Sequence, residues 1–285
     1  MAGFFGFFDF TKEGPGVKKN EKKKKGFFVF FEIYFRNIWN FAKAGMIYWL
    51  CSVFVVTNGL AKAGITHIAR TTTRQKHTFV FSDFIDTVKA NWKQCLVLGI
   101  LNTVLTALLI FDVYFFWMNL MAEFSAFAVI GLGVALFLSI CFTFMKYYIW
   151  TMAITFKLTL KQLVKNSFQF VFINLGRNIL ISLALGIFYA ALFLLQSING
   201  LFWVIAVLLL VLVLPGFKSS LIQANTFPAI KKYIIDPYYA EHKGEDIEKR
   251  LALGLEISED ELPGQKETDE KVFSDTQTSR NNDSE

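Results

Sequence analysis

Uncharged apolar runs long enough to cross a lipid bilayer dominate this sequence. Residues 126–145 contain no Asp, Glu, Lys or Arg, and residues 95–117 form an apolar stretch interrupted by a single Asp. As helices rising 1.5 Å per residue, these runs extend about 30–35 Å, which matches the hydrocarbon core of a bilayer. Only 18% of the residues are charged while 54% are hydrophobic, which is too apolar for an ordinary soluble domain. The sequence therefore predicts an all-α, multi-span transmembrane helical bundle.

About five segments are expected to cross the membrane, within a membrane domain of residues 26–240. The predicted spans are about 45–60, 95–117, 126–145, 178–196 and 198–217. Short turns separate the second span from the third and the fourth from the fifth, so each pair forms a helical hairpin. The first span is short and has Lys and Arg on both sides. The alternative is therefore a re-entrant first segment, with four crossings and both ends of the chain inside.

The distribution of Lys and Arg orients the two hairpins. Their turns, residues 118–125 and 197–200, contain neither residue type, whereas the connectors 59–94 and 146–177 carry six and five. Positively charged loops are retained in the cytoplasm. We therefore expect a multi-pass protein of the cell membrane, with both turns outside and the connectors and the C-terminal tail in the cytoplasm.

The two ends of the chain carry opposite charge. Residues 1–25 form a basic, aromatic tail. Its candidate contacts with anionic lipid headgroups are Lys22, Lys23, Lys24 and Lys25. Residues 241–285 hold 14 Asp and Glu against 6 Lys and Arg, and their few large apolar residues predict an acidic, disordered tail. Membrane lipids are the expected partners, and nucleic acid is not, because the basic residues lie between apolar spans.

An internal repeat relates the two cytoplasmic connectors. Residues 84–92 and 160–168 both have bulky apolar residues at relative positions 0, 4 and 8 and Lys at position 5, and each stretch precedes a hairpin. This spacing places the apolar residues on one helix stripe and predicts a helix on the inner membrane surface. The bundle is then a parallel repeat of a surface helix and a hairpin. Chance matching of common residues such as Phe and Leu is the alternative.

Ionisable groups at membrane depth are candidate sites, because burying them is costly unless they are used. Asp112 lies in an apolar span and is the candidate solute or proton site, together with Asn102 on the same helix. The alternative puts the Asp112 carboxylate at the outer interface and gives Asn102 a role in helix packing. The three Cys and three His are scattered without metal-ligand spacing, and no catalytic or nucleotide motif occurs. The sequence therefore predicts no metal, no cofactor and no enzymatic activity.

One motif resembles a known family. Trp49-Leu50-Cys51-Ser52, followed by Val55-Val56-Thr57 and by Gly59, is similar to the YesL-like family of bacterial integral membrane proteins. The lead-in 35–39 and the segment 84–93 also resemble that family, and the resemblance covers roughly residues 30–235. Phe54 stands where members usually have proline. Because members are often encoded near genes for carbohydrate uptake and glycan degradation, the resemblance implies an accessory role there, and it supplies no site residue.

Three functions fit this sequence. The first is a non-enzymatic accessory to solute (carbohydrate) uptake, whose partners are uptake-system subunits or further copies of the chain. The second is a small transporter in its own right that uses Asp112. The third is a structural membrane protein that organises lipid or partners.

Overall fold

The computed structural model describes residues 26–241, and every secondary-structure element that it contains is helical. The helices in chain order are α1 (Gly26–Arg36), α2 (Ile38–Ser52), η1 (Val55–Thr57), α3 (Asn58–Thr73), α4 (Val80–Ala122), α5 (Ala126–Thr155), α6 (Leu160–Ile173), α7 (Leu175–Gln196), α8 (Gly200–Leu208), η2 (Leu209–Val213), α9 (Leu214–Ile230), η3 (Lys231–Ile235) and α10 (Asp236–Glu241). Within the described residues, four helical segments are long and apolar enough to cross a membrane: Val80–Ala122, Ala126–Thr155, Leu175–Gln196 and Gly200–Tyr239. The predicted all-α, multi-span class is confirmed.

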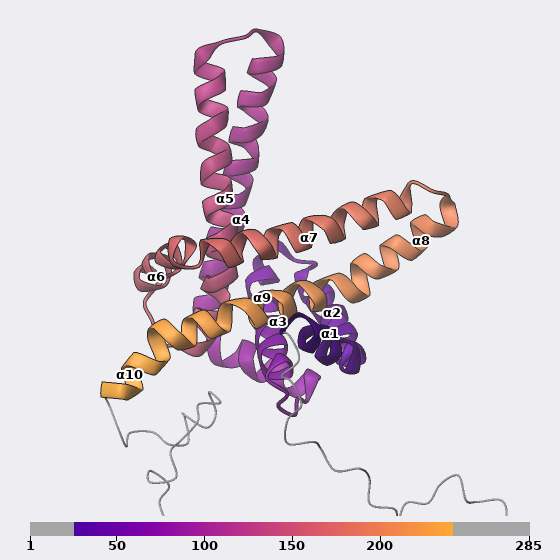
Figure 1. Ribbon diagram of the computed structural model, residues 1–285, viewed down its shortest axis with the longest axis vertical. Helices are drawn as coiled ribbons and strands as arrows, with labels where there is room; N and C mark the ends of the chain where they lie inside the picture. Colours follow the sequence, from indigo (N-terminus) through magenta and orange to yellow (C-terminus); the bar gives the residue numbers. More distant parts are fainter. Residues whose placement is uncertain (1–25, 242–285) are drawn as a thin grey trace, which may run out of the picture.

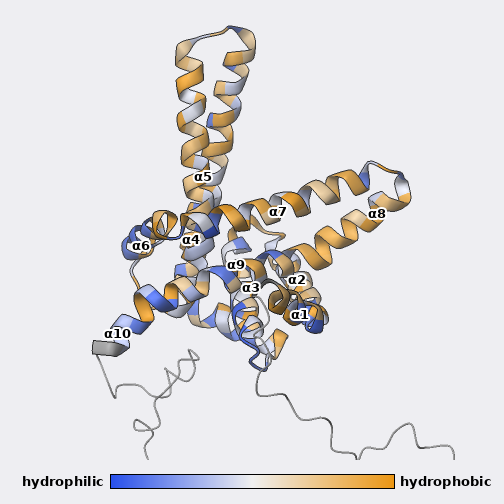
Figure 2. Ribbon diagram, viewed as in Figure 1, coloured by the Kyte–Doolittle hydropathy of each residue, from blue (hydrophilic) through white to orange (hydrophobic). Residues whose placement is uncertain are grey.

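Two helical hairpins project from a common body in different directions (Figure 1). One consists of α4 and α5, and the other of α7 and α8, while α1, α2, α3 and α9 form the body. Figure 2 shows that the hairpins are mostly hydrophobic, whereas hydrophilic residues gather in the body and on α6. Four of the five predicted spans lie within these hairpins and in α9. The predicted tails, residues 1–25 and 241–285, lie outside the described residues except for Glu241.

Apolar side chains cover the outside of both hairpins. Phe111 and Ile130 on the first hairpin and Leu180 and Ile187 on the second are all more than half exposed. Exposed apolar surface of this extent is unfavourable in water and is stable where lipid or another protein covers it. The hairpins are therefore the membrane-embedded part of the protein.

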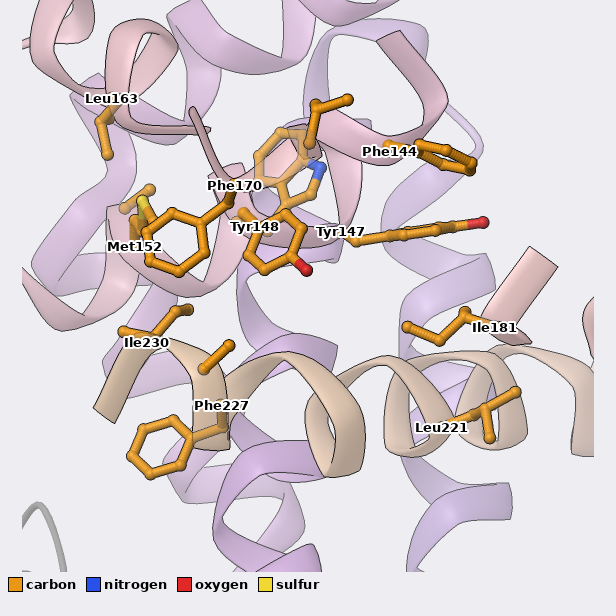
Figure 3. Close-up of a cluster of buried hydrophobic side chains, with 14 of the residues drawn as sticks. Phe144, Tyr147, Tyr148, Met152, Leu163, Phe170, Ile181, Leu221, Phe227 and Ile230 are labelled. Atoms are coloured by element: carbon orange, nitrogen blue, oxygen red, sulfur yellow. The ribbon is translucent and has the colours of Figure 1, made fainter. Parts of the chain in front are cut away.

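The main hydrophobic core lies where α5, α6, α7 and α9 meet (Figure 3). Tyr148 is fully buried there and stacks on Phe170, with ring centroids 5.1 Å apart. The Tyr148 hydroxyl donates a hydrogen bond of 2.6 Å to Asn178 Oδ1, and Asn178 Nδ2 donates to the carbonyls of Phe170 and Val171. Because a buried amide is costly unless it is hydrogen-bonded, Asn178 ties α7 to α5 and α6.

Residues 45–60 do not form a fifth span, which corrects the prediction. α2 ends at Ser52, the chain turns through η1, and α3 runs back beside α2 and along α4. The Thr57 hydroxyl donates to the carbonyls of Cys51 and Phe54 and closes this turn. α3 packs inside the bundle because its residues are small: a Cβ on Gly59 would lie 2.1 Å from the Cys95 carbonyl oxygen. The four-crossing alternative therefore agrees with the structure.

The two copies of the sequence repeat differ in structure. Residues 160–168 lie in the separate helix α6, which ends at Ile173 before α7 begins at Leu175. Residues 84–92 instead continue without a break into the first membrane helix, α4, which is 43 residues long. The expected separate surface helix therefore exists only in the second copy. Asn174 lies at the break there, and the equivalent position in α4, 76 residues earlier, is the apolar Leu98.

The last apolar segment is a broken helix. Pro215, the second residue of α9, has no N–H to donate to the Val211 carbonyl four residues earlier, and the preceding turn, η2, widens into a π-helix. The Tyr34 hydroxyl donates to the Val213 carbonyl at 3.4 Å. Gly45 of α2 packs against the Leu212 carbonyl, which would lie 3.0 Å from a Cβ at that position. Helices α1 and α2 therefore cover the irregular backbone, as membrane-embedded breaks require.

Candidate functional site

A cavity of about 930 Å³ lies at the fork between the two hairpins. Thr106 and Ile110 of α4 line it on one side and Gly186 and Tyr189 of α7 on the other, while α3 and α9 contribute the remaining walls. Its volume is within the range of small-molecule sites. We call it the lysine cavity, because its lining includes Lys62, Lys146 and Lys218.

The three lysines come from three different helices. Lys62 lies on α3, Lys146 on α5 and Lys218 on α9, and none of the described residues that line the cavity is Asp or Glu. Lys62 and Lys146 are half-buried, while Lys218 is more exposed. Lys62 Nζ lies 5.4 Å from the centroid of the Trp150 ring, a contact that compensates only part of the cost of a desolvated ammonium group.

The positive charges around the cavity and the burial of Lys62 both affect the pKa of Lys62. Burial, together with the charges of Lys146 and Lys218, lowers the pKa of Lys62 to about 8. α3 also begins at the cavity with Asn58, so that the positive end of its helix dipole adds to the same potential. The cavity therefore favours an anion.

Unpartnered amide oxygens also line the cavity. Asn58 Oδ1, Asn102 Oδ1 and Gln223 Oε1 are buried and have no hydrogen-bond partner within residues 26–241. Gln223 is 3% exposed, and its amide nitrogen donates to Thr151 Oγ1 at 2.7 Å, which leaves its oxygen as the open end. Buried acceptors of this kind require a donor from water or from a ligand.

Hydroxyl groups complete the polar lining. They belong to Tyr48, Thr66, Thr103, Thr106, Thr143, Tyr147, Ser182, Tyr189 and Ser219. The Tyr147 hydroxyl lies 2.8 Å from Ser182 Oγ, and Figure 3 shows the Tyr147 ring at the edge of the core. The cavity thus combines positive charge with groups that both donate and accept hydrogen bonds.

Residues 25–113 match a family model. Its description is "Protein of unknown function, DUF624". The match covers 89 of the 285 residues, and the YesL-like assignment stays a prediction. No curated protein and no solved structure matches the chain.

The DUF624 match supplies only part of the lysine cavity. It includes Lys62, Asn58 and Asn102 but ends before Lys146 and Lys218. The complete cavity therefore depends on a stretch of chain outside the matched segment.

The structure separates the two candidate residues of the predicted solute site. Asn102 lines the lysine cavity. Asp112 lies ten residues further along α4, half-buried, and it lines neither this cavity nor the groove of about 440 Å³ beside it. The candidate headgroup contacts Lys22 to Lys25 lie outside the described residues.

Sequence reasoning did not identify the three lysines as a site. It counted Lys62 and Lys146 among the loop charges that set orientation. A signal was present, because Lys146 and Lys218 each directly follow an apolar run, 126–145 and 198–217. Within the described residues, no group of three His, Cys, Asp or Glu side chains is placed to hold a metal ion.

Proposed function

We propose that this DUF624-matching membrane protein binds a small anionic solute in the lysine cavity and transports it, without enzymatic chemistry. The observation that carries the proposal is the convergence of Lys62, Lys146 and Lys218 on one cavity whose described lining has no carboxylate. Unpaired cations within a membrane protein are costly, and they mark solute or ion sites by default. A bound anion would offset that cost.

Two breaks in the helices beside the cavity support transport. The α2–α3 turn brings the N-terminus of α3 to the cavity, and the π-helical turn η2 precedes α9, which carries Lys218. Transporters commonly use discontinuous helices whose N-termini point at anionic groups of the substrate. We therefore assign the solute site to the lysine cavity rather than to Asp112.

A second candidate is the accessory role in carbohydrate uptake that the YesL-like resemblance implies. The exposed apolar faces of the hairpins support it, because residues such as Phe127 and Ile187 are about 70% exposed and suit a subunit interface as well as lipid. Purification in mild detergent separates the candidates. A stoichiometric uptake-system subunit would favour the accessory role, and a homo-oligomer alone would favour the transporter.

Anion binding by the purified full-length protein tests the proposal. We expect calorimetry to detect binding of at least one of chloride, phosphate, acetate and D-glucuronate, and proteoliposomes to accumulate the anion that binds. A variant with Lys62→Gln, Lys146→Gln and Lys218→Gln should lose both signals. Lys165→Gln is the matched control, because Lys165 is exposed on α6 and outside the cavity lining.

Two results would contradict the proposal. One is the absence of binding for all four anions, which the third candidate, a structural protein that organises lipid, predicts. The other is unchanged binding in the triple variant.

A further inference from the structure

We infer that the anion bound in the lysine cavity carries several hydroxyl groups, as a sugar acid or a glycerol phosphate does. This inference rests on the proposed function and names the ligand class for the same site. It comes from groups that the anion-binding proposal does not use, the amide oxygens of Asn58, Asn102 and Gln223.

A simple anion would pair with the lysines of the cavity but not with its amide oxygens. Chloride or phosphate accepts hydrogen bonds from the lysine ammonium groups but offers the amide oxygens little or nothing, and its negative charge repels them. A buried acceptor left without a donor weakens binding. Three such acceptors therefore select against an anion that has acceptors alone.

A hydroxylated anion meets both sets of groups. Its charged end accepts from Lys62, Lys146 and Lys218, and its hydroxyls donate to the amide oxygens. The acceptors come from α3, α4 and α9, and the lysines from α3, α5 and α9, so both kinds of group surround the same space.

The remaining lining fits the same class of ligand. Trp49 also lines the cavity and adds apolar aromatic surface, which suits the C–H face of a sugar ring. The volume of about 930 Å³ holds a ligand of monosaccharide or disaccharide size with bridging water.

Three matched probes test the inference on the unaltered full-length protein. D-glucuronate has a carboxylate and hydroxyls, cyclohexanecarboxylate has the charge and a six-membered ring without hydroxyls, and methyl glucoside has hydroxyls without charge. We expect calorimetry to show D-glucuronate binding about tenfold or more tightly than either of the others, which corresponds to two or three paired acceptors. Equal binding of cyclohexanecarboxylate and D-glucuronate would overturn the inference while leaving anion binding intact. Failure of both anions to bind would overturn the proposed function as well.

A single variant tests whether the amide oxygen of Asn102 contributes to the preference for a hydroxylated anion. Asn102→Leu removes one amide oxygen at similar side-chain volume, and we expect it to weaken D-glucuronate binding about three- to tenfold without weakening cyclohexanecarboxylate binding. Lys146→Gln should weaken both. The matched control is Asn119→Leu, because Asn119 lies on the same helix, is exposed and is outside the cavity lining. Equal loss for both probes in Asn102→Leu would contradict the role of the amide oxygen.

The hydroxylated anion has two natural sources, a soluble sugar acid and the headgroup of phosphatidylglycerol. Nanodiscs distinguish them. Weaker D-glucuronate binding in discs that contain phosphatidylglycerol than in phosphatidylcholine discs would identify the lipid headgroup as an occupant of the same site. Equal binding in both would identify the soluble acid. Tighter binding in the anionic discs would contradict competition for one site and overturn the inference.

Discussion

Lys62 links the fold to the proposed chemistry at the scale of a single side chain. Its place on α3 puts it over the Trp150 ring and among the other lysines, and the cost appears in its pKa, lowered to about 8. The Trp150 ring offsets only part of this cost, and no carboxylate lines the cavity among the described residues. The side chain is therefore less favourable for stability than an apolar residue would be, as expected of a residue kept for binding.

The titration of Lys62 predicts how stability varies with pH. Between its folded pKa of about 8 and its ordinary value of 10.5, the unfolded chain binds a proton that the folded chain does not, so the free energy of unfolding rises with pH. We expect the melting temperature to rise more between about pH 7 and about pH 10 in the original protein than in Lys62→Met. Lys89→Met is the control, because Lys89 is exposed on α4 and should leave the rise unchanged. An equal rise in Lys62→Met would refute the assignment.

The same titration acts on binding in the opposite direction. Loss of the Lys62 proton removes a positive charge from the lysine cavity, so anion affinity should fall as the pH rises through about 8. Lys62→Arg keeps the charge at these pH values and should retain affinity above pH 8. Calorimetric titrations with D-glucuronate across this range measure both. A pH-independent affinity would show that Lys62 does not contact the anion.

At the residue scale, sequence reasoning identified one residue of the site. Asn102 was selected because it lies in an apolar span, and it does line the cavity. Lys62 and Lys146 were interpreted as loop charges, because each lies beside an apolar run and nothing local shows that α3 folds back. Their convergence depends on residues 62, 146 and 218, far apart in the sequence, meeting in three dimensions.

At the scale of elements, the close contact of α3 with α4 sets the shape of the body. The Gly59 and Gly99 backbones meet so closely that a Cβ on either residue would lie 2.6 Å from the Cα of the other. This contact holds the first turn of α3, and with it Asn58, beside the cavity. Hydropathy alone predicts a span over residues 45–60 because the stretch is apolar, and it contains no information about this approach.

Gly59→Ala should therefore destabilise the protein. Both opposing groups are backbone atoms that cannot rotate away, so we expect a loss of about 1–3 kcal/mol and a melting temperature lower by several degrees. The control is Gly133→Ala on α5, where an added Cβ meets nothing within 4 Å and the higher helix propensity of Ala is neutral or stabilising. Thermal unfolding in detergent measures both. Equal stability of the two variants would argue against the tight α3–α4 contact.

At the scale of the whole molecule, four crossings would give an even count and leave both ends of the described chain on one side of the membrane. The loop charges predict that this side is the cytoplasm. The periodicity of apolar runs was sufficient to predict the two hairpins. It was not sufficient to predict their directions, because these depend on core contacts such as that of Tyr148 with Asn178.

Cysteine accessibility tests this topology. In a chain with Cys51, Cys95 and Cys141 replaced, cysteines introduced by Ala122→Cys and Asn199→Cys should react with an impermeant reagent on intact cells, because both positions are exposed at the hairpin turns. The Gln162→Cys variant, altered on α6, should react only after the cells are opened. Labelling of Ala122→Cys and Asn199→Cys from opposite sides would contradict the four-crossing arrangement.

Because the lysine cavity lies in the fork between the hairpins, we expect the thickness of the bilayer to affect the shape of the cavity. Each hairpin must keep its apolar length within the hydrocarbon layer, so membrane thickness acts on the angle between them. That angle sets the width of the space between Thr106 on α4 and Tyr189 on α7. Anion affinity measured in nanodiscs of short-chain and long-chain lipids should therefore differ. Bilayer thickness would then regulate the affinity of the protein for the anion.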